Sequence, residues 1–98
     1  MSDEIQNIKM AQAVEYSSKE NPFTVTYCSA LRSGKFGDEY RLLMKQGEQT
    51  YGLTTNHKAI IDRIFKHKDS MVLCKVWFVQ KNSMNGGMYY QINIVDNE

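Results

Sequence analysis

The sequence predicts a mainly β domain with one helix, and two observations carry this prediction. The first is the segment from residue 71 to residue 95, in which two runs rich in Val, Ile, Tyr, Phe and Trp flank the loop Asn85-Gly86-Gly87. Such runs on either side of a glycine-containing loop are typical of a β-hairpin. The second is one stretch of helical periodicity between Ile60 and Phe65, where apolar residues recur three and four positions apart.

Size and composition limit the chain to one globular domain. With 98 residues, of which 42% are hydrophobic and 23% charged, it can bury a single core and lies outside the range of disordered chains. No apolar run approaches the roughly 20 residues of a membrane span. Cys28 and Cys74 form neither a disulfide framework nor a closely spaced metal-ligand pair. We therefore expect a cytoplasmic protein with reduced cysteines, no membrane association and no bound metal or cofactor.

The net charge of +1 conceals a basic body between acidic ends. Residues 21 to 95 carry ten Lys and Arg against five Asp and Glu, whereas both ends hold an excess of carboxylates. This distribution suits a polyanionic partner. Ordinary solvated surface charge explains it as well.

Residues 1 to 20 are expected to form an N-terminal arm or helix, apart from a main domain over residues 21 to 98. Ile5 and Ile8 fit a helical stripe, whereas Val14 and Tyr16 fit strand alternation, so neither pattern decides the structure. Pro22 disfavours helix at the residue before it and marks a new start.

Three strands are predicted next. The first runs from Phe23 to Arg32, with Phe23, Val25 and Tyr27 on one face. A glycine-flanked turn from Ser33 to Asp38 exposes Lys35 and Phe36 at its tip. The second strand, Glu39 to Lys45, alternates the apolar set Tyr40, Leu42 and Met44 with Arg41, Leu43 and Lys45, and a reversal at Gln46-Gly47-Glu48 leads to a short third strand, Gln49 to Thr54.

A helix of about three turns follows. Thr55 or Asn56 offers an N-cap, and Ile60, Ile61, Ile64 and Phe65 form its apolar face. Lys66, His67 and Lys68 occupy the last turn, where cations interact favourably with the helix dipole.

The closing hairpin is expected to have one apolar and one aromatic-basic face. Alternation places Val72, Cys74, Val76 and Phe78 in the core together with Tyr90, Ile92 and Ile94. The other face then presents Trp77 and Tyr89 among Lys75, Lys81, Gln91 and Asn93. Aromatic rings interleaved with amines suit the stacking of bases and the neutralisation of phosphates. The alternative is that both rings belong to the rim of an ordinary core.

Three strands, a helix and two further strands resemble the OB-fold, and the chain is similar to the single-stranded-DNA-binding proteins of bacteria and phages. The resemblance covers residues 23 to 95 and rests on element order and length, including Gly52 in the third strand, without a diagnostic motif. It implies a five-stranded Greek-key barrel with the helix between strands three and four. The acidic tail with a terminal aromatic found in that family is reduced here to Asp96-Asn97-Glu98.

The same resemblance implies that a ligand crosses the second and third strands between the loops that join strands one and two and strands four and five. These positions supply Arg41, Lys45, Thr50 and Tyr51, the loop residues Lys35 and Phe36, and the segment from Asn82 to Met88. Tyr51 shares a face with Leu53 and fits a core position equally well. The candidate nucleic-acid-binding residues are Lys35, Phe36, Arg41, Lys45, Tyr51, Lys75, Trp77, Lys81 and Tyr89.

We therefore expect a protein that binds single-stranded nucleic acid without sequence specificity, DNA in the first place, as in DNA replication. An enzyme is not expected, because the chain has no Walker loop, HExxH or Cys-x-x-Cys motif and nothing near Cys28 activates it. The alternative is a small protein-interaction module, such as a phage or mobile-element factor that binds a host protein. A homodimer formed through an edge strand is compatible with either function.

Overall fold

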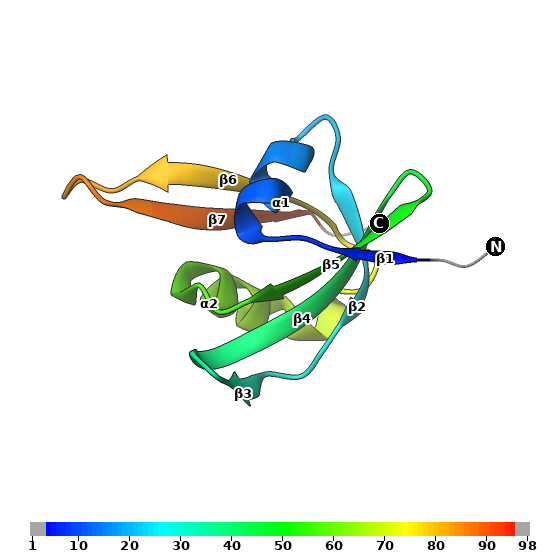
Figure 1. Ribbon diagram of the computed structural model, residues 1–98, viewed down its shortest axis with the longest axis horizontal. Helices are drawn as coiled ribbons and strands as arrows, with labels where there is room; N and C mark the ends of the chain where they lie inside the picture. Colours follow the sequence, from blue (N-terminus) through cyan, green and yellow to red (C-terminus); the bar gives the residue numbers. More distant parts are fainter. Residues whose placement is uncertain (1–3, 96–98) are drawn as a thin grey trace.

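An open mixed sheet of seven strands, with two helices, makes up the computed structural model, which describes residues 4 to 95 (Figure 1). The main strand order is β1-β5-β4-β2-β6-β7, and β3 pairs with β4 off this path. The elements are β1 (Ile5–Asn7), α1 (Met10–Tyr16), β2 (Phe23–Cys28), β3 (Arg32–Gly34), β4 (Gly37–Gln46), β5 (Gln49–Thr55), α2 (Lys58–His67), a 3-10 turn (Lys68–Ser70), β6 (Lys75–Asn82) and β7 (Met88–Val95).

The predicted five-stranded barrel is wrong, because the sheet does not close. Closure would require the third and fifth predicted strands, β5 and β7, to pair. The free edge of β5 is instead taken by β1, which runs parallel to it with Ile5 opposite Thr50 and Asn7 opposite Gly52. β7 therefore stays at the far end of the sheet, paired only with β6 among the described strands.

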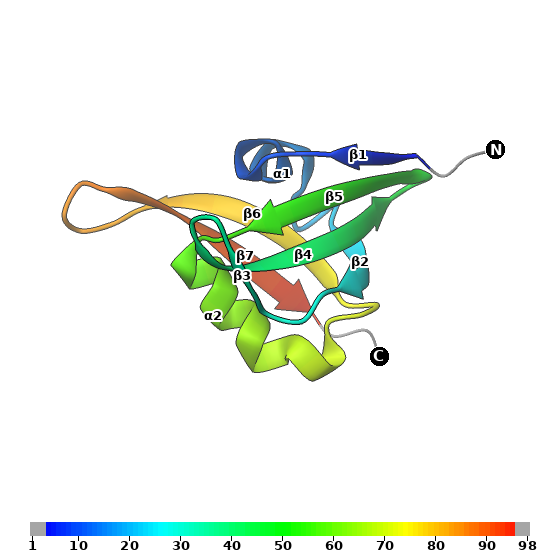
Figure 2. The ribbon, with the colours of Figure 1, turned by 60° about the horizontal axis from the view of Figure 1, so that its bottom comes forward.

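The N-terminal segment belongs to the same core as the rest of the described chain. Ile8, Met10 and Ala13 are buried within it, and the Ser17 hydroxyl accepts a hydrogen bond from the Phe78 backbone N–H at 3.0 Å. In Figure 2, α1 lies at the top beside β1, and α2 lies at the bottom. Of the two alternatives left open for residues 1 to 20, a helix is present as α1, but the strand β1 that precedes it was not expected. The seven residues of α1 give too short a periodic signal to decide from the sequence.

The sheet has two faces of different character, here named the inner and the outer face. Residues directly opposite one another on neighbouring strands point to the same side, so the pairing register assigns each residue to a face. On the inner face Phe23 pairs with Val76, and Val25 pairs with Met44, all four with no exposed area. The buried apolar core comprises Ile8, Met10, Ala13, Phe23, Val25, Tyr40, Leu42, Met44, Leu53, Ile60, Ile64, Met71, Cys74, Val76, Phe78 and Ile92.

The alternation predicted for the second strand is confirmed in β4, but β2 departs from its predicted pattern. A β-bulge lies between Val25 and Tyr27, so Tyr27 pairs with Leu43 on the outer face and Cys28 pairs with Leu42 on the inner face. A bulge adds one residue to one strand and thereby reverses the side on which later residues point. The predicted position of Tyr27 beside Phe23 and Val25 is therefore wrong.

The predicted helix between strands is confirmed as α2, with a narrower buried face than expected. Ile60 and Ile64 are fully buried, whereas Phe65 is half exposed and contacts the Lys68 amine 4.6 Å from its ring centroid. The predicted N-cap at Thr55 or Asn56 is wrong, because His57 is the N-cap residue. The Thr55 hydroxyl accepts a hydrogen bond from the His57 backbone N–H.

The closing hairpin is confirmed as β6 and β7, but its predicted start is wrong. Residues 71 to 74 form a turn in which Leu73 has a φ of 76°. The turn buries Met71 and leaves Val72 exposed, which is the reverse of the alternation expected for a strand. The far end of the hairpin formed by β6 and β7 extends away from the body as an arm (Figure 1). Neither helix in residues 4 to 95 has the length and hydrophobicity that crossing a bilayer requires.

Candidate nucleic-acid interface

A continuous row of paired residues crosses the outer face from one edge of the sheet to the other. Thr24 of β2 is opposite Lys45 of β4 on one side and Lys75 of β6 on the other. The strand spacing separates the Cα atoms of the two lysines by about 10 Å. Both side chains are exposed, and neither has a carboxylate partner among residues 4 to 95. From β1 to β7 the row reads Ile5, Thr50, Lys45, Thr24, Lys75 and Val95.

On β6 and β7 the predicted aromatic-basic face is present. Trp77 pairs with Asn93, and Lys81 pairs with Tyr89, both on the side opposite the buried Val76 and Phe78. Tyr89 is 41% exposed, and Trp77 is half-buried. Four residues of extended strand place Trp77 and Lys81 about 13 Å apart. Lys75, Trp77, Lys81 and Tyr89 thus form one strip along the hairpin.

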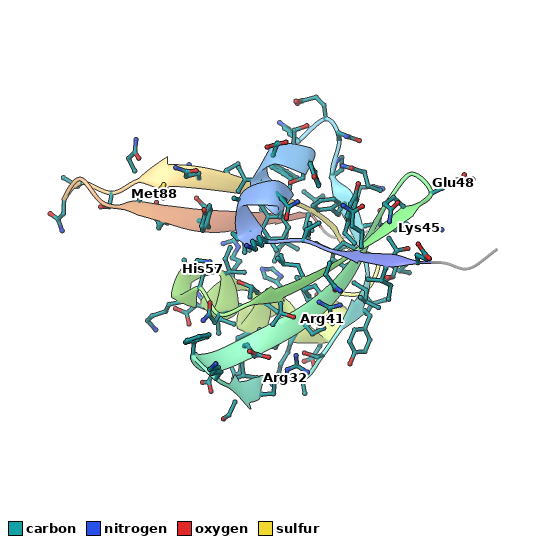
Figure 3. All side chains as sticks on the ribbon, viewed as in Figure 1. Arg32, Arg41, Lys45, Glu48, His57 and Met88 are labelled. Atoms are coloured by element: carbon teal, nitrogen blue, oxygen red, sulfur yellow. The ribbon has the colours of Figure 1, made fainter. Side chains whose placement is uncertain are left out.

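Arg41 and Lys45 belong to the outer face of β4, as the alternation predicted. Figure 3 shows both on the body of the molecule and Met88 out on the arm. The Arg41 guanidinium donates to the Thr54 hydroxyl at 3.2 Å and to the Asn7 side-chain oxygen at 2.5 Å. Thr50, the other residue expected near the ligand, pairs directly with Lys45.

Tyr51 lies on the inner face and not beside the other candidates. It pairs with Met44, and its ring centroid is 5.6 Å from those of Tyr16 and Phe23. Of the two alternatives that the sequence left open for Tyr51, ligand contact or core, the structure shows packing against the core. Tyr27, which sequence reasoning did not include, takes the aromatic position on the outer face and is 47% exposed. The outward position of Tyr27 follows from the bulge in β2, which regular alternation does not predict.

Lys35 and Phe36 lie apart from the sheet face, at the tip of the β3–β4 hairpin. Phe36 is 79% exposed, and the Lys35 amine is 5.7 Å from its ring centroid. The turn expected from Ser33 to Asp38 is shorter than predicted, because β3 extends to Gly34 and β4 begins at Gly37. The segment from Asn82 to Met88 forms the tip of the other hairpin, with the Met84 side chain fully exposed.

The electrostatics of the outer face favour an anionic ligand. Four cations of its strands, Arg41, Lys45, Lys75 and Lys81, have no ion-pair partner among residues 4 to 95. The carboxylate at an outer position of β4, Glu39, is paired with Arg32 at 2.8 Å. A hollow of about 260 Å³ elsewhere, between the start of β4 and α2, has the opposite character, because Asp38 and Asp62 line it with only Lys58 to balance them. An anion is therefore expected on the sheet face and not in this hollow.

Two reactive side chains outside the outer face, Cys28 and Tyr40, have pKa values shifted by their surroundings. Burial raises the pKa of the Cys28 thiol, which disfavours the nucleophilic thiolate. Burial also raises the pKa of Tyr40, with smaller contributions from Cys28 and Asp38, and its buried hydroxyl has no hydrogen-bond partner among residues 4 to 95. No cluster of three or more potential metal ligands occurs in these residues.

No family model, no curated protein and no solved structure matches this chain.

Proposed function

We propose that the protein binds single-stranded nucleic acid on the outer face of its sheet, without sequence specificity. The observation that carries the proposal is the cross-strand row in which Lys45 and Lys75 flank Thr24. It joins two groups of residues, Tyr27 and Arg41 on one side and the strip with Trp77 on the other, into one surface. Cations that contact the backbone and rings that stack on bases are the two elements of sequence-tolerant binding.

Phosphate contacts and base stacking of ordinary strength would together give this surface useful affinity for a single strand. Each phosphate neutralised on a single strand contributes about 0.7 to the slope of log K against log salt, so Arg41, Lys45, Lys75 and Lys81 together predict a slope near −3. Stacking contributes about 1 to 3 kcal/mol for each base in contact with an aromatic ring. Tyr27, Trp77 and Tyr89 are the rings available on this face.

The experiment is a fluorescence titration with an oligo-dT strand. Trp77 is the only tryptophan in the chain, so its emission reports the proposed surface directly. We expect quenching on binding and a steep loss of affinity as KCl rises. The double variant Lys58→Ala, Lys66→Ala removes two cations from α2 and serves as a control that should leave affinity close to wild type. Absence of both quenching and a mobility shift at low salt would remove the proposal.

Protein interaction is the second candidate function, favoured by the turn before β6. Val72 and Leu73 are adjacent and each more than half exposed. The turn is fixed by a hydrogen bond of 2.7 Å from the Leu73 N–H to the Val25 carbonyl. Positive φ is strained for a leucine, and such strain is concentrated at functional sites. If this turn serves a protein partner, the variant Val72→Ser, Leu73→Asn should abolish that contact and leave oligo-dT affinity unchanged.

A further inference from the structure

Arg41 is held in place by neutral groups from two other strands. Its Nη1 donates to the Thr54 hydroxyl of β5, and its Nη2 donates to the Asn7 side-chain oxygen of β1. Asn7 and Arg41 are 34 residues apart in the sequence, and the parallel pairing of β1 with β5 brings them together. The guanidinium therefore has a fixed position on the outer face.

Gly52 provides the space that this position requires. It lies between Asn7 and Leu43 in the pairing of β1, β5 and β4, and its carbonyl accepts a hydrogen bond from the Ile8 N–H at 2.9 Å. A Cβ atom added to Gly52 would overlap Nη2 of Arg41 and lie 2.7 Å from the Asn7 oxygen. Any other residue at position 52 would force the Arg41 guanidinium or the Asn7 side chain, or both, out of this arrangement.

The charge of Arg41 is not neutralised within the described chain. A guanidinium has five N–H donors, and only two of those on Arg41 have acceptors among residues 4 to 95, both of them uncharged. Arg32, on the neighbouring hairpin, differs in this respect, because its Nε donates to the Glu39 carboxylate at 2.8 Å. The same small sheet thus contains one arginine that is ion-paired and one that is positioned without an anion.

We propose that Arg41 is a preorganised phosphate-binding site, in which Asn7, Gly52 and Thr54 are positioning residues. The proposal rests on the proposed function and adds to it a specific contact to the backbone phosphodiester. Planar guanidinium donors match phosphate oxygens well, and fixing the donor in advance reduces the entropy lost on binding. It also gives β1 a role, because this strand supplies the Asn7 acceptor.

The test compares variants at these positions in oligo-dT affinity, in salt slope and in urea unfolding. Arg41→Ala should weaken binding at least tenfold at low salt and reduce the slope by about 0.7. Asn7→Ala and Gly52→Ala should each weaken it severalfold in the wild type and have no further effect in the Arg41→Ala background. Gln6→Ala, at the neighbouring position of β1, is the matched control and should change nothing.

The variant Asn7→Asp distinguishes the effect of the charge of Arg41 from the effect of its position. The aspartate keeps an acceptor for Nη2 but neutralises the guanidinium, so affinity and salt slope should fall while the free energy of unfolding is maintained or increased. Full binding by folded Asn7→Asp and Gly52→Ala, or effects of Asn7→Ala that add to those of Arg41→Ala, would overturn the inference and leave the proposed function standing. Failure of the wild-type protein to bind at any salt concentration would instead overturn the proposed function, and this inference with it.

Discussion

The two faces of the sheet are built from alternate residues of the same strands, yet they differ in almost every property. On the inner side of β4, Tyr40, Leu42 and Met44 are 1%, 0% and 0% exposed. On the outer side, Leu43 is half-buried between Arg41 and the exposed Lys45. Folding is stabilised mainly by the first set, and ligand binding is proposed for the second. Substitutions at inner positions should therefore lower the free energy of unfolding, whereas substitutions at adjacent outer positions should lower the affinity for the ligand.

The largest contrast is expected at neighbouring positions of β2. Phe23 is fully buried against Tyr51 and Phe78, with ring centroids at 5.6 and 6.1 Å. Phe23→Ala should lower the free energy of unfolding by about 3 to 5 kcal/mol. Thr24→Ala, on the outer face, should change it by less than about 0.5 kcal/mol. Urea denaturation measures both, and equal losses would contradict the assignment of faces.

The next largest effects on stability and binding are expected at Tyr51 on the inner face and Tyr27 on the outer face. Tyr51→Leu should cost roughly 1 to 3 kcal/mol of stability, since it removes a ring packed on the core, and leave oligo-dT affinity unchanged. Tyr27→Leu should leave stability nearly unchanged and lose about 1 to 3 kcal/mol of binding energy if the ring stacks on a base. Urea unfolding and oligo-dT binding curves of the two variants measure the contrast. Loss of stability in Tyr27→Leu with loss of binding in Tyr51→Leu would contradict the assignment of these residues to their faces.

The cross-strand row predicts a change in salt dependence. Lys45→Gln together with Lys75→Gln should reduce the slope of log K against log salt by about 1.4, because two phosphate contacts are lost. Unfolding should be unaffected, since both side chains are exposed. Affinities measured from 50 to 200 mM KCl provide the slope. An unchanged slope would exclude these lysines from the contact with the ligand.

The smallest expected effect is on the inner face and concerns alkaline pH. Burial raises the pKa of Cys28 in the folded state, so the unfolded chain loses this proton first as the pH rises. Stability should be unaffected well below the ordinary thiol pKa of about 8.5 and should fall above it. Cys28→Ser should reduce this fall, as urea unfolding at several pH values would show. The decline that remains above about pH 10 is expected from Tyr40, whose pKa is also raised.

Strand alternation allowed the local structure to be predicted where strands are long and regular. The eight or more residues of β4, β6 and β7 each give several alternations, so the faces of Lys45, Lys75, Trp77 and Tyr89 were predicted correctly. The three residues of β1 give no such signal, although β1 occupies the edge that keeps the sheet open and supplies Asn7 to Arg41.

Local departures from regular geometry explain most of the remaining differences. The bulge after Val25 exchanges the faces of Tyr27 and Cys28, and no residue type marks it in the sequence. The turn at residues 71 to 74, in which Leu73 has a positive φ, buries Met71 and exposes Val72. A glycine at position 73 would have indicated this turn in the sequence. Hydrogen bonds between segments far apart in the sequence accompany both departures: the Leu73 N–H donates to the Val25 carbonyl, and the Thr26 hydroxyl donates to the Leu43 carbonyl.

The most direct test of the central claim is a map of the ligand on the protein by ¹H–¹⁵N NMR during titration with oligo-dT. We predict that the largest amide shifts fall on outer-face residues of β2, β4, β5, β6 and β7, around Tyr27, Arg41, Lys45, Lys75 and Trp77. Amides of α2 and of the turn at Val72 and Leu73 should change little. Shifts concentrated on α2 or on that turn, with the outer face unaffected, would contradict the account.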